Sequence, residues 1–593
     1  GYRLWDPESR KILRSNDVYF NEAKFHAKPE KVEEIRRVIF QEDGPSTSTR
    51  QQTRAQAQEP EPDRVEQDPV VEPPVLRRSE RVLHPPDRYV PSIQYVMLTD
   101  CGEPSCYKES VQMADSGNWQ LAMQSEMQAL HKNQTWDLVK LPAGKKALPC
   151  KWVYRYKLTP HDEQPKYKAR LVAKGFKQEQ GIDFDEVFSP VVKMTTLRCV
   201  LALVAKQDLV LHQMDVKTAF LHGDLHEDVY MQQPEGFIEE GSEDLVCKLN
   251  KSLYGLKQSA RDWYQKFHKF MLSQGYRRSE IDHCLYTKRS KDGSLLILIL
   301  YVDDMLIAGR QMAEISALKS KMAKVFDMKD MGEASHMLGL RIRRDREKRL
   351  LYLSQEEYID KVLQRFNMEK GKALLTPLPS YVKLSKQDCP ESDAEKAEMD
   401  KVPYASAVGS LMYAMIATRP DIAFAVGVVS RYMSNPGKKH WEAVKGILRY
   451  LKATKHMCIC YGSQDLSVKG YTDSDYAGDL DKRRSTSGYV FTLTGGAVSW
   501  RSQLQDCVTQ STTEAEYVAA SEACKEAIWL SRLVADLGIK EEMPALHCDS
   551  QSAIQLAKNP VFHAKTKHVD VKYHFIREVI EDKQIELVKV HTT

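Results

Sequence analysis

The chain has 593 residues, enough for about three to five domains of ordinary size. Charged residues make up 28% of it and the net charge is only +4, so bulk charge does not indicate a partner. The longest strongly apolar run, residues 295–302, is far shorter than the ~20 residues that span a bilayer, which excludes a transmembrane protein. The twelve cysteines contain no CxxC pair, which argues against a disulfide framework and a structural zinc site.

The first part of the chain predicts a small module followed by a linker. It begins with Gly1 rather than methionine, so we expect a piece of a longer protein. Residues 1–40 suggest a small module with a short strand at Val18–Phe20. Proline, glutamate, glutamine, serine and threonine then dominate, and few aromatic residues remain to offset the entropy of ordering. We therefore predict a disordered linker over 41–117.

Folded structure is predicted to begin again at about residue 118. Apolar side chains from Trp119 to Leu130 recur at helical spacing. The segment Lys145–Lys177 holds ten lysines and arginines against two acids, interleaved with tryptophan and tyrosine. Strands and helices then alternate irregularly, which predicts an α+β or α/β multidomain fold.

Two segments place aspartates at the ends of apolar strands. Asp303 and Asp304 follow the strand 295–300 and precede the apolar run 305–308, so we expect a hairpin with both carboxylates at its tip. Asp215 ends another apolar strand that begins at Val210. Each aspartate alone has an ordinary explanation, since Asp303 and Asp304 suit a turn and Asp215 suits a helix N-cap. Three converging carboxylates would repel one another without cations, and two divalent ions would also serve phosphoryl transfer.

The C-terminal part predicts a connection and then a separate unit. A proline-containing stretch, 372–398, is followed by an amphipathic helix over 438–455, whose outer cations are candidate contacts to nucleic-acid phosphates: Lys438, Lys439, Lys445, Arg449 and Lys452. The alternative is a merely solvated basic face. A strand at 468–472, a glycine-turned hairpin and a helix over 513–536 follow, with acids at Asp473, Glu516 and Asp549. Each acid has a local alternative too, because Thr513 and Glu516 form a capping-box pattern and the aspartates suit turns or caps.

At this point the sequence resembles the Pol polyproteins of copia-type LTR retrotransposons, from about Trp119 to the C-terminus. Four motifs in the family's order carry the resemblance: KARLVAKGF at 168–176, QMDVKTAFLHG around Asp215, SLYGLKQSARDWY at 252–264 and YVDD at 301–304. The resemblance implies an SH3-like module from the integrase region at 1–40 and a right-hand polymerase (fingers, palm, thumb) over 118–371. A connection at 372–465 and a ribonuclease H-like domain at 466–593 would follow.

In the polymerase part, the resemblance implies an RNA-directed DNA polymerase. It assigns Asp215, Asp303 and Asp304 as ligands of two Mg²⁺ ions, with Mn²⁺ as an alternative metal. It further implies a grip on the incoming dNTP by five residues: Lys168, Arg170, Phe220, Tyr254 and Gly255. Phe220 would exclude ribonucleotides, against the alternative of an ordinary core ring, and Lys168 and Arg170 could instead lie on a solvated strand edge. The family usually has Ala-Pro-Arg where this chain has Ser259-Ala-Arg, so we expect a looser loop there.

In the last part, the resemblance implies two further Mg²⁺ ions, held by Asp473, Glu516 and Asp549, that would serve cleavage of the RNA in an RNA–DNA hybrid. Asp475 and Glu514 rank second as ligands. His591 matches the histidine that helps product release. The family's fourth carboxylate lies beyond this position and the chain stops at Thr593, with Asp570 as the only nearby substitute. We therefore expect a weakened or inactive ribonuclease H site.

The partners implied are an RNA or DNA template–primer, dNTPs, an RNA–DNA hybrid and other pieces of the Pol polyprotein, with no membrane. The implied location is cytoplasmic, in a virus-like particle, with nuclear entry as part of an integration complex. The alternative function is a degenerate or domesticated element protein that binds nucleic acid without synthesis. A host repair polymerase is a weaker third, because it leaves the ribonuclease H-like unit unexplained.

Overall fold

A computed structural model describes residues 2–6, 11–15, 103–157, 166–462, 465–539, 543–559 and 573–591. The chain divides into two compact units, Gly1–Asp87 and Arg88–Thr593. In the first unit, β1 (Tyr2–Asp6) and β2 (Lys11–Ser15) form an antiparallel pair. The predicted strand at Val18–Phe20 and residues 41–102 of the predicted linker lie outside the described residues. Within the described residues, no helix is both long and apolar enough to cross a membrane.

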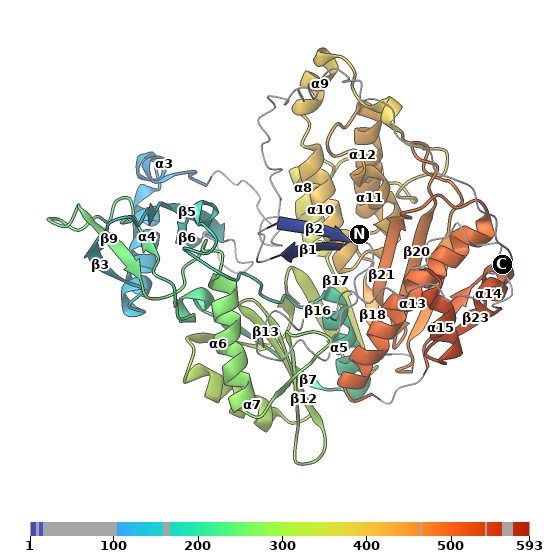
Figure 1. The fold of residues 1–593 in the computed structure, drawn as a ribbon, viewed down its shortest axis with the longest axis horizontal. Coiled ribbons are helices and arrows are strands. Elements are labelled where there is room, and N and C mark those ends of the chain that lie inside the picture. Colours follow the sequence, from blue (N-terminus) through green and yellow to red (C-terminus); the bar gives the residue numbers. More distant parts are fainter. Residues whose placement is uncertain are drawn as a thin grey trace, which may run out of the picture. The chain divides into compact units, whose positions relative to one another are not determined.

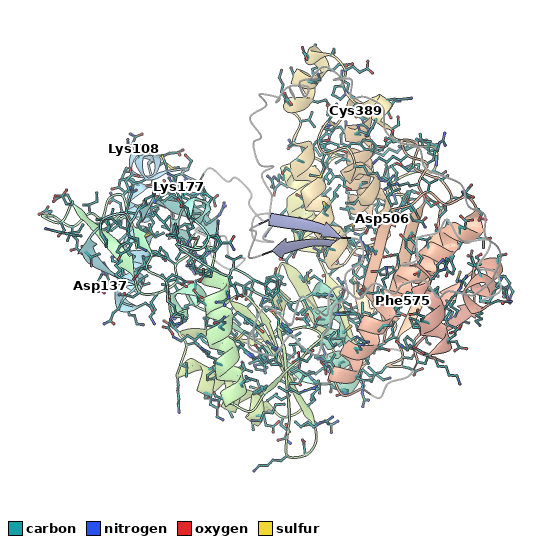
Figure 2. The ribbon with its side chains drawn as sticks, viewed as in Figure 1. Lys108, Asp137, Lys177, Cys389, Asp506 and Phe575 are labelled. Carbon is teal, nitrogen blue, oxygen red and sulfur yellow. The ribbon has the colours of Figure 1, made fainter. Side chains whose placement is uncertain are left out.

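The second unit begins with a small helical and β-sheet layer built on one aromatic core. Trp119 of the second helix is fully buried and its ring lies against Tyr154 and Tyr167 of the neighbouring hairpin. Lys108, Asp137 and Lys177 are exposed side chains of this layer (Figure 2). Its elements are α3 (Tyr107–Gln112), α4 (Ser116–Lys132), the antiparallel pair β5 (Cys150–Lys157) and β6 (Lys166–Ala173), and a sheet ordered β3-β9-β8-β4: Trp136–Lys140, Leu245–Leu249, Tyr230–Met231 and Ala147–Leu148.

The predicted disordered linker, 41–117, is wrong at its C-terminal end, because α3 forms there. Ser110 of α3 is buried and its hydroxyl donates to the Tyr154 hydroxyl, 3.0 Å away. Just before the helix, Glu103 accepts a bond from Arg155 at 2.6 Å. Because these partners lie more than 40 residues further along the chain, the local composition gave no sign of the order.

The palm region is a six-stranded antiparallel sheet in the order β10-β11-β12-β13-β7-β14. The predicted hairpin is present as β12 (Leu295–Tyr301) and β13 (Asp304–Gly309), and the predicted strand is β7 (Val210–Val216). Nearly every residue of β12 and β13 is buried, which explains their continuous apolar sequence. The remaining elements are β10 (Arg277–Arg278), β11 (Leu285–Arg289), β14 (Met328–Glu333), α5 (Met194–Gln207), α6 (Ser259–Ser273) and α7 (Met312–Ala323).

After the palm sheet, the chain forms a four-stranded sheet and a layer of helices (Figure 1). The sheet has the order β15-β16-β17-β18, so a strand of the predicted connection completes a sheet begun by the polymerase part. The helices α8, α10, α11 and α12 share a core of their own. The bounds are β15 (His336–Met337), β16 (Leu340–Asp345), β17 (Leu350–Ser354), β18 (Ile459–Tyr461), α8 (Glu356–Arg365), α9 (Asp393–Asp400), α10 (Tyr404–Ala417), α11 (Ala423–Ser430) and α12 (Lys438–Ala453).

The last part is a five-stranded sheet in the order β21-β20-β19-β22-β23, packed against the long helix α13 (Figure 1). Its first three strands are antiparallel neighbours, and β19, β22 and β23 run parallel. The predicted hairpin, helix and left-handed Gly538 are all present. The bounds are β19 (Lys469–Ser474), β20 (Thr486–Leu493), β21 (Gly496–Leu504), α13 (Thr512–Asp536), β22 (Ala545–Cys548), α14 (Gln551–Lys558), α15 (Phe575–Glu581) and β23 (Glu586–Lys589). The mixed α and β architecture predicted from the sequence is confirmed.

The palm and this last part share one hydrophobic core, and a buried arginine crosses their junction. Arg198 of α5 is 4% exposed. It donates to the carbonyl oxygens of Val498 at 2.7 Å, Ile416 at 2.7 Å and Ala417 at 3.0 Å. Its guanidinium also lies 3.9 Å from the ring centroid of Trp500. One side chain thus joins the palm, α10 and β21.

Candidate active sites

The sheet register brings the first three predicted carboxylates together. Asp304 of β13 lies directly opposite Asp215 of the neighbouring antiparallel strand β7. Asp303 occupies the turn just before β13, and its carbonyl oxygen accepts from the Val216 amide at 2.9 Å. The alternative of Asp215 as a helix N-cap is wrong, because Asp215 lies inside a strand and Thr218 caps the following 3₁₀ turn.

Trp263 and Gln213, which the sequence did not single out, hold the turn that contains Asp303. Val302 adopts a φ of +56°, which is unfavourable for a β-branched residue. The indole Nε1 of Trp263, on α6, donates to the Val302 carbonyl at 2.6 Å. Gln213 of β7 donates to Asp304 Oδ1 at 3.4 Å. The motif containing Trp263 was recognised, but its contact with the turn depends on the packing of α6, which no local pattern reveals.

The electrostatics of this site favour a cation. Loss of solvation raises the pKa of Asp303 above its ordinary value, and the neighbouring Asp215 charge raises it further. The cations of Arg170 and Lys168 act in the opposite direction. An oxygen-rich, net negative set of this kind suits Mg²⁺ or Mn²⁺. The residues therefore fit the metal that the resemblance implies.

The residues predicted to grip the nucleotide lie beside the carboxylates. The Arg170 guanidinium lies over the Tyr254 ring, 4.7 Å from its centroid. The Phe220 ring is tilted against the same tyrosine, with the two ring centroids 4.7 Å apart. Lys168 precedes Arg170 on β6. Phe220 is partly buried and packs against the main hydrophobic core, so the alternative of a core ring also fits its position. The five predicted residues thus come from β6, the 3₁₀ turn after β7 and the loop before α6.

Gly255, in the loop before α6, is needed for the conformation and close approach of the backbone, apart from any ligand. Gly255 has a φ of +95°, and a Cβ there would collide with the Ala173 carbonyl oxygen. The Ala173 amide donates to the Tyr254 carbonyl at 2.8 Å, so the end of β6 lies directly on the loop. The expected loosening at Ser259 is offset, because the Ser259 hydroxyl donates to the Leu253 carbonyl at 2.5 Å and closes the loop.

The second carboxylate set also converges. Thr472 and Cys548 are register partners on the parallel strands β19 and β22, so Asp473 and Asp549 follow at the same edge of the sheet. Glu516, on α13, accepts from the Ser474 amide at 2.9 Å. Ligand atoms of Glu516, Cys548 and Asp549 lie within 4.8 Å of one another. Cys548 was not predicted as part of this site, although it directly precedes Asp549.

Glu516 has a strongly perturbed titration. Burial, followed by the charges of Asp473 and Asp549, raises its pKa to about 8. Its side chain is 7% exposed and faces carboxylates rather than a basic partner. A divalent cation is the partner that this arrangement fits, with three carboxylates as its oxygen donors.

The two acids ranked second have structural roles. The helix cap is Ser511, whose hydroxyl accepts from the Glu514 amide, while the Glu514 carboxylate accepts from the Gln510 amide at 2.8 Å. The alternative of a Thr513–Glu516 capping box is therefore wrong, and Glu516 is left for the site. The Asp475 carboxylate accepts from the Thr486 amide. His591 follows β23, whose Lys589 pairs with Cys548, and its side chain is exposed. Asp570 lies outside the described residues.

On the outer face of α12, each of the five cations predicted to contact phosphates has an acceptor within the chain. Lys438 and Lys439 remain about three-quarters exposed (73% and 74%), and exposed ion pairs of this kind are weak, so the phosphate contacts stay a prediction. The pairs are Lys438–Glu398, Lys439–Asp388, Lys445–Glu442, Arg449 with the Lys372 carbonyl and Lys452 with the Gly371 carbonyl.

Comparisons with known proteins agree with the motifs. Residues 133–380 match the family of reverse transcriptases (RNA-dependent DNA polymerases), and residues 1–34 match the retroviral polymerase SH3-like domain. Over 617 aligned positions the chain is 51% identical to the retrovirus-related Pol polyprotein from transposon TNT 1-94 of Nicotiana tabacum, covering 100% of this chain and 46% of that protein. It is 37% identical to the Pol polyprotein from transposon RE1 of Arabidopsis thaliana, covering 85% of this chain and 34% of that protein.

A shorter relative is covered completely. The chain is 35% identical to the putative transposon Ty5-1 protein of Saccharomyces cerevisiae, over 53% of this chain and 100% of that protein. The chain spans between a third and a half of the length of the two plant polyproteins.

Proposed function

The chain belongs to the Pol polyproteins of copia-type LTR retrotransposons, and from this premise we propose that it is an RNA-directed DNA polymerase that extends a primer on an RNA or DNA template. The observation that carries the proposal is the register of β7 against β13, which sets Asp215 opposite Asp304 with Asp303 in the adjoining turn. A protein kept only for binding nucleic acid would not need three repelling carboxylates at one turn.

Asp215, Asp303 and Asp304 would hold Mg²⁺. When bound, these ions neutralise the triphosphate and stabilise the attacking and leaving oxygens of nucleotidyl transfer. The chain's own contribution is orientation and charge. Arg170 and Lys168 bring positive charge to the side where the triphosphate would bind, and their fields already act on Asp303. Positioning and charge neutralisation supply most of the catalysis in this class of reaction.

Phe220 would set the choice of sugar. Its ring rests against Tyr254, so the ring cannot easily turn away from a nucleotide placed over the loop. A fixed ring at this point would collide with a 2′-hydroxyl and admit only deoxyribonucleotides. Phe220→Val should then incorporate ribonucleoside triphosphates that the wild type rejects, in an assay that compares the two nucleotide pools.

We propose a second activity for the C-terminal part, cleavage of the RNA strand of an RNA–DNA hybrid, at the weakened rate expected from the sequence. Asp473, Glu516 and Asp549 would hold the metal ions, which supply an activated water when bound. Glu516 is set by the Ser474 amide to face both aspartates. The other pieces of the Pol polyprotein are the proposed partners, and a cytoplasmic virus-like particle is the proposed location.

The polymerase proposal is tested by dNTP incorporation on poly(rA)–oligo(dT) with Mg²⁺. The wild type should extend the primer, and Asp303→Asn should lower the rate at least about 1,000-fold, because the site loses a metal ligand. The matched control is Asp330→Asn, since Asp330 lies on the neighbouring strand β14 but pairs with Lys319. A wild-type chain that binds the template–primer but never extends it would favour the alternative, a binding protein without synthesis.

A further inference from the structure

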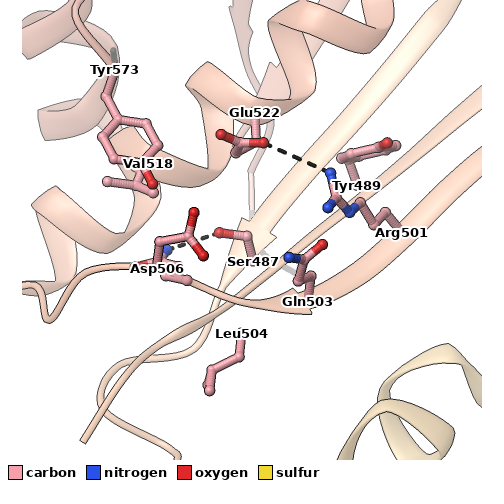
Figure 3. A pocket seen from close by; sticks show the side chains of 10 residues that line it. Ser487, Tyr489, Arg501, Gln503, Leu504, Asp506, Val518, Glu522 and Tyr573 are labelled. Carbon is pink, nitrogen blue, oxygen red and sulfur yellow. Dashed lines mark hydrogen bonds and ion pairs between the residues drawn. The ribbon is translucent and has the colours of Figure 1, made fainter. Parts of the chain in front are cut away.

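Gln505 lies where three elements of the second carboxylate site meet. It directly follows β21, and its side chain is 5% exposed. Its amide nitrogen donates to the Ser485 carbonyl at 2.8 Å, which fixes the backbone against the start of β20. Gln505 is one of the residues that line a cavity between β20, β21 and α13. Ser487, Gln503 and Glu522 lie on the walls of this cavity (Figure 3).

The Gln505 side-chain amide reaches residues adjacent to two of the carboxylates. Nε2 lies 3.3 Å from Ser474 Oγ and 2.9 Å from the Ala515 carbonyl oxygen. Ser474 follows Asp473 on β19, and Ala515 precedes Glu516 on α13. A third acceptor, Ser487 Oγ on β20, lies 2.8 Å away. One NH₂ group therefore bridges β19, β20 and the first turns of α13.

The bridge continues to Glu516 itself. The Ser474 amide donates to Glu516 Oε1, so the residue that Gln505 holds is also the residue that orients Glu516. The oxygen of the same side-chain amide, Gln505 Oε1, is buried and has no hydrogen-bond partner among the described residues. A buried acceptor without a partner lowers stability, so this amide is poorly explained by packing alone.

We propose that Gln505 is a positioning residue for the Asp473–Glu516–Asp549 site, which sets the distance between the strand carboxylate and the helix carboxylate. The proposal deepens the hybrid-cleaving function proposed above and rests on it. Outer residues that orient metal ligands typically change metal affinity or activity about 10–100-fold when replaced. Gln505 is expected to act in that range without touching the substrate.

The test uses full-length chains that carry Asp303→Asn and Asp304→Asn, so that the first site no longer dominates metal binding. In this background we compare Gln505→Leu with Gln503→Leu. Gln503 lies two positions earlier on the wall of the same cavity and is exposed. Electron paramagnetic resonance titration gives the Mn²⁺ dissociation constant, hybrid cleavage gives kcat and KM, and calorimetry gives Tm.

We expect Gln505→Leu to weaken Mn²⁺ binding and lower kcat at least about tenfold, with KM for the hybrid nearly unchanged. Tm should fall by a few degrees, because three acceptors lose their donor, while the variant stays folded at the assay temperature. Gln503→Leu should leave all four quantities unchanged. Equal Mn²⁺ affinity in Gln505→Leu and its parent would overturn the proposal, as would a fall in Tm that accounts for the whole loss. A parent that binds Mn²⁺ but does not cleave hybrid would refute only the proposed cleavage function, because the Mn²⁺ comparison still tests Gln505. A parent without Mn²⁺ binding would overturn both.

Discussion

At the scale of single residues, both sites rely on carboxylates held where they repel one another. Asp303 lies beside Asp215, and Glu516 faces Asp473 and Asp549. In each case burial and like charge raise a pKa, so the metal-free protein bears an electrostatic cost that a bound cation removes. This cost gives a measurable pH dependence.

Glu516 should make the metal-free protein less stable as the pH rises. Its folded-state pKa of about 8 exceeds the ordinary value of 4.5, so its stabilising contribution is complete below about pH 4.5 and is lost as the pH rises to about 8. Glu516→Gln stays neutral and should gain stability over the wild type as the pH increases, by at most about 5 kcal/mol at alkaline pH. Denaturation in EDTA at two pH values measures the gain. Glu514→Gln, on the same turn, should show no such gain, and an equal gain in both variants would contradict the explanation.

At the scale of elements, the fingers hairpin meets the palm through backbone contacts. The end of β6 binds the loop at Tyr254, and Gly255 makes this approach possible. Arg170, on the same strand, is thereby placed over the Tyr254 ring. The position of Arg170, which is proposed to bind the triphosphate, therefore depends on the loop backbone.

Gly255→Ala should separate β6 from the loop. The added Cβ would collide with the Ala173 carbonyl at a φ of +95°, so Arg170 and Lys168 would shift away from the carboxylates. We expect dNTP incorporation to fall about 100-fold, since displacements near 1 Å can cost this much. Gly293→Ala is the matched control, because Gly293 has a φ of +80° but no atom within 4 Å of the new Cβ. Similar losses in both variants would mean that the φ angle alone is responsible.

Elements with strong local patterns could be predicted from the sequence. The hairpin around Asp303 and the helix that carries Glu516 follow from apolar runs and helical spacing, and their bounds agree closely with the structure. What joins them could not be predicted. Trp263 reaches Val302 across 39 positions and Gln505 reaches Ser474 across 31, and such pairs form only when separate elements pack.

The basic helix face shows the same limit. Its lysines matched a nucleic-acid contact by composition, but Lys439 pairs with Asp388 and Lys452 with the Gly371 carbonyl. Asp388 lies in the proline-containing connecting stretch and Gly371 lies just before it, and the sequence predicted no helix or strand at either position. The spacing of the lysines and arginines showed which side of α12 faces outward, but it could not show which acceptors within the chain these cations contact.

At the scale of the whole molecule, Arg198 links the palm to the C-terminal part within the second unit. Its three carbonyl acceptors lie on α10 and β21, and Trp500 stacks on it. Arg198→Met would leave these acceptors without their charged donor, at a cost of about 2 kcal/mol. We expect a Tm lower by about 2–4 °C in calorimetry. Arg277→Met is the control at the same junction, because Arg277 is exposed and its pair with Asp536 should matter little. Equal effects would contradict a special role for Arg198.

We propose that one chain carries two separate carboxylate sites, one that makes DNA and one that cuts RNA. The most direct test follows both products in one reaction, with a labelled RNA template and a labelled DNA primer in Mg²⁺. Asp303→Asn should stop primer extension and still cut the RNA of a preformed hybrid, whereas Asp473→Asn should extend the primer and leave the RNA intact. Loss of both products in either variant, or loss of neither, would contradict the assignment of separate sites.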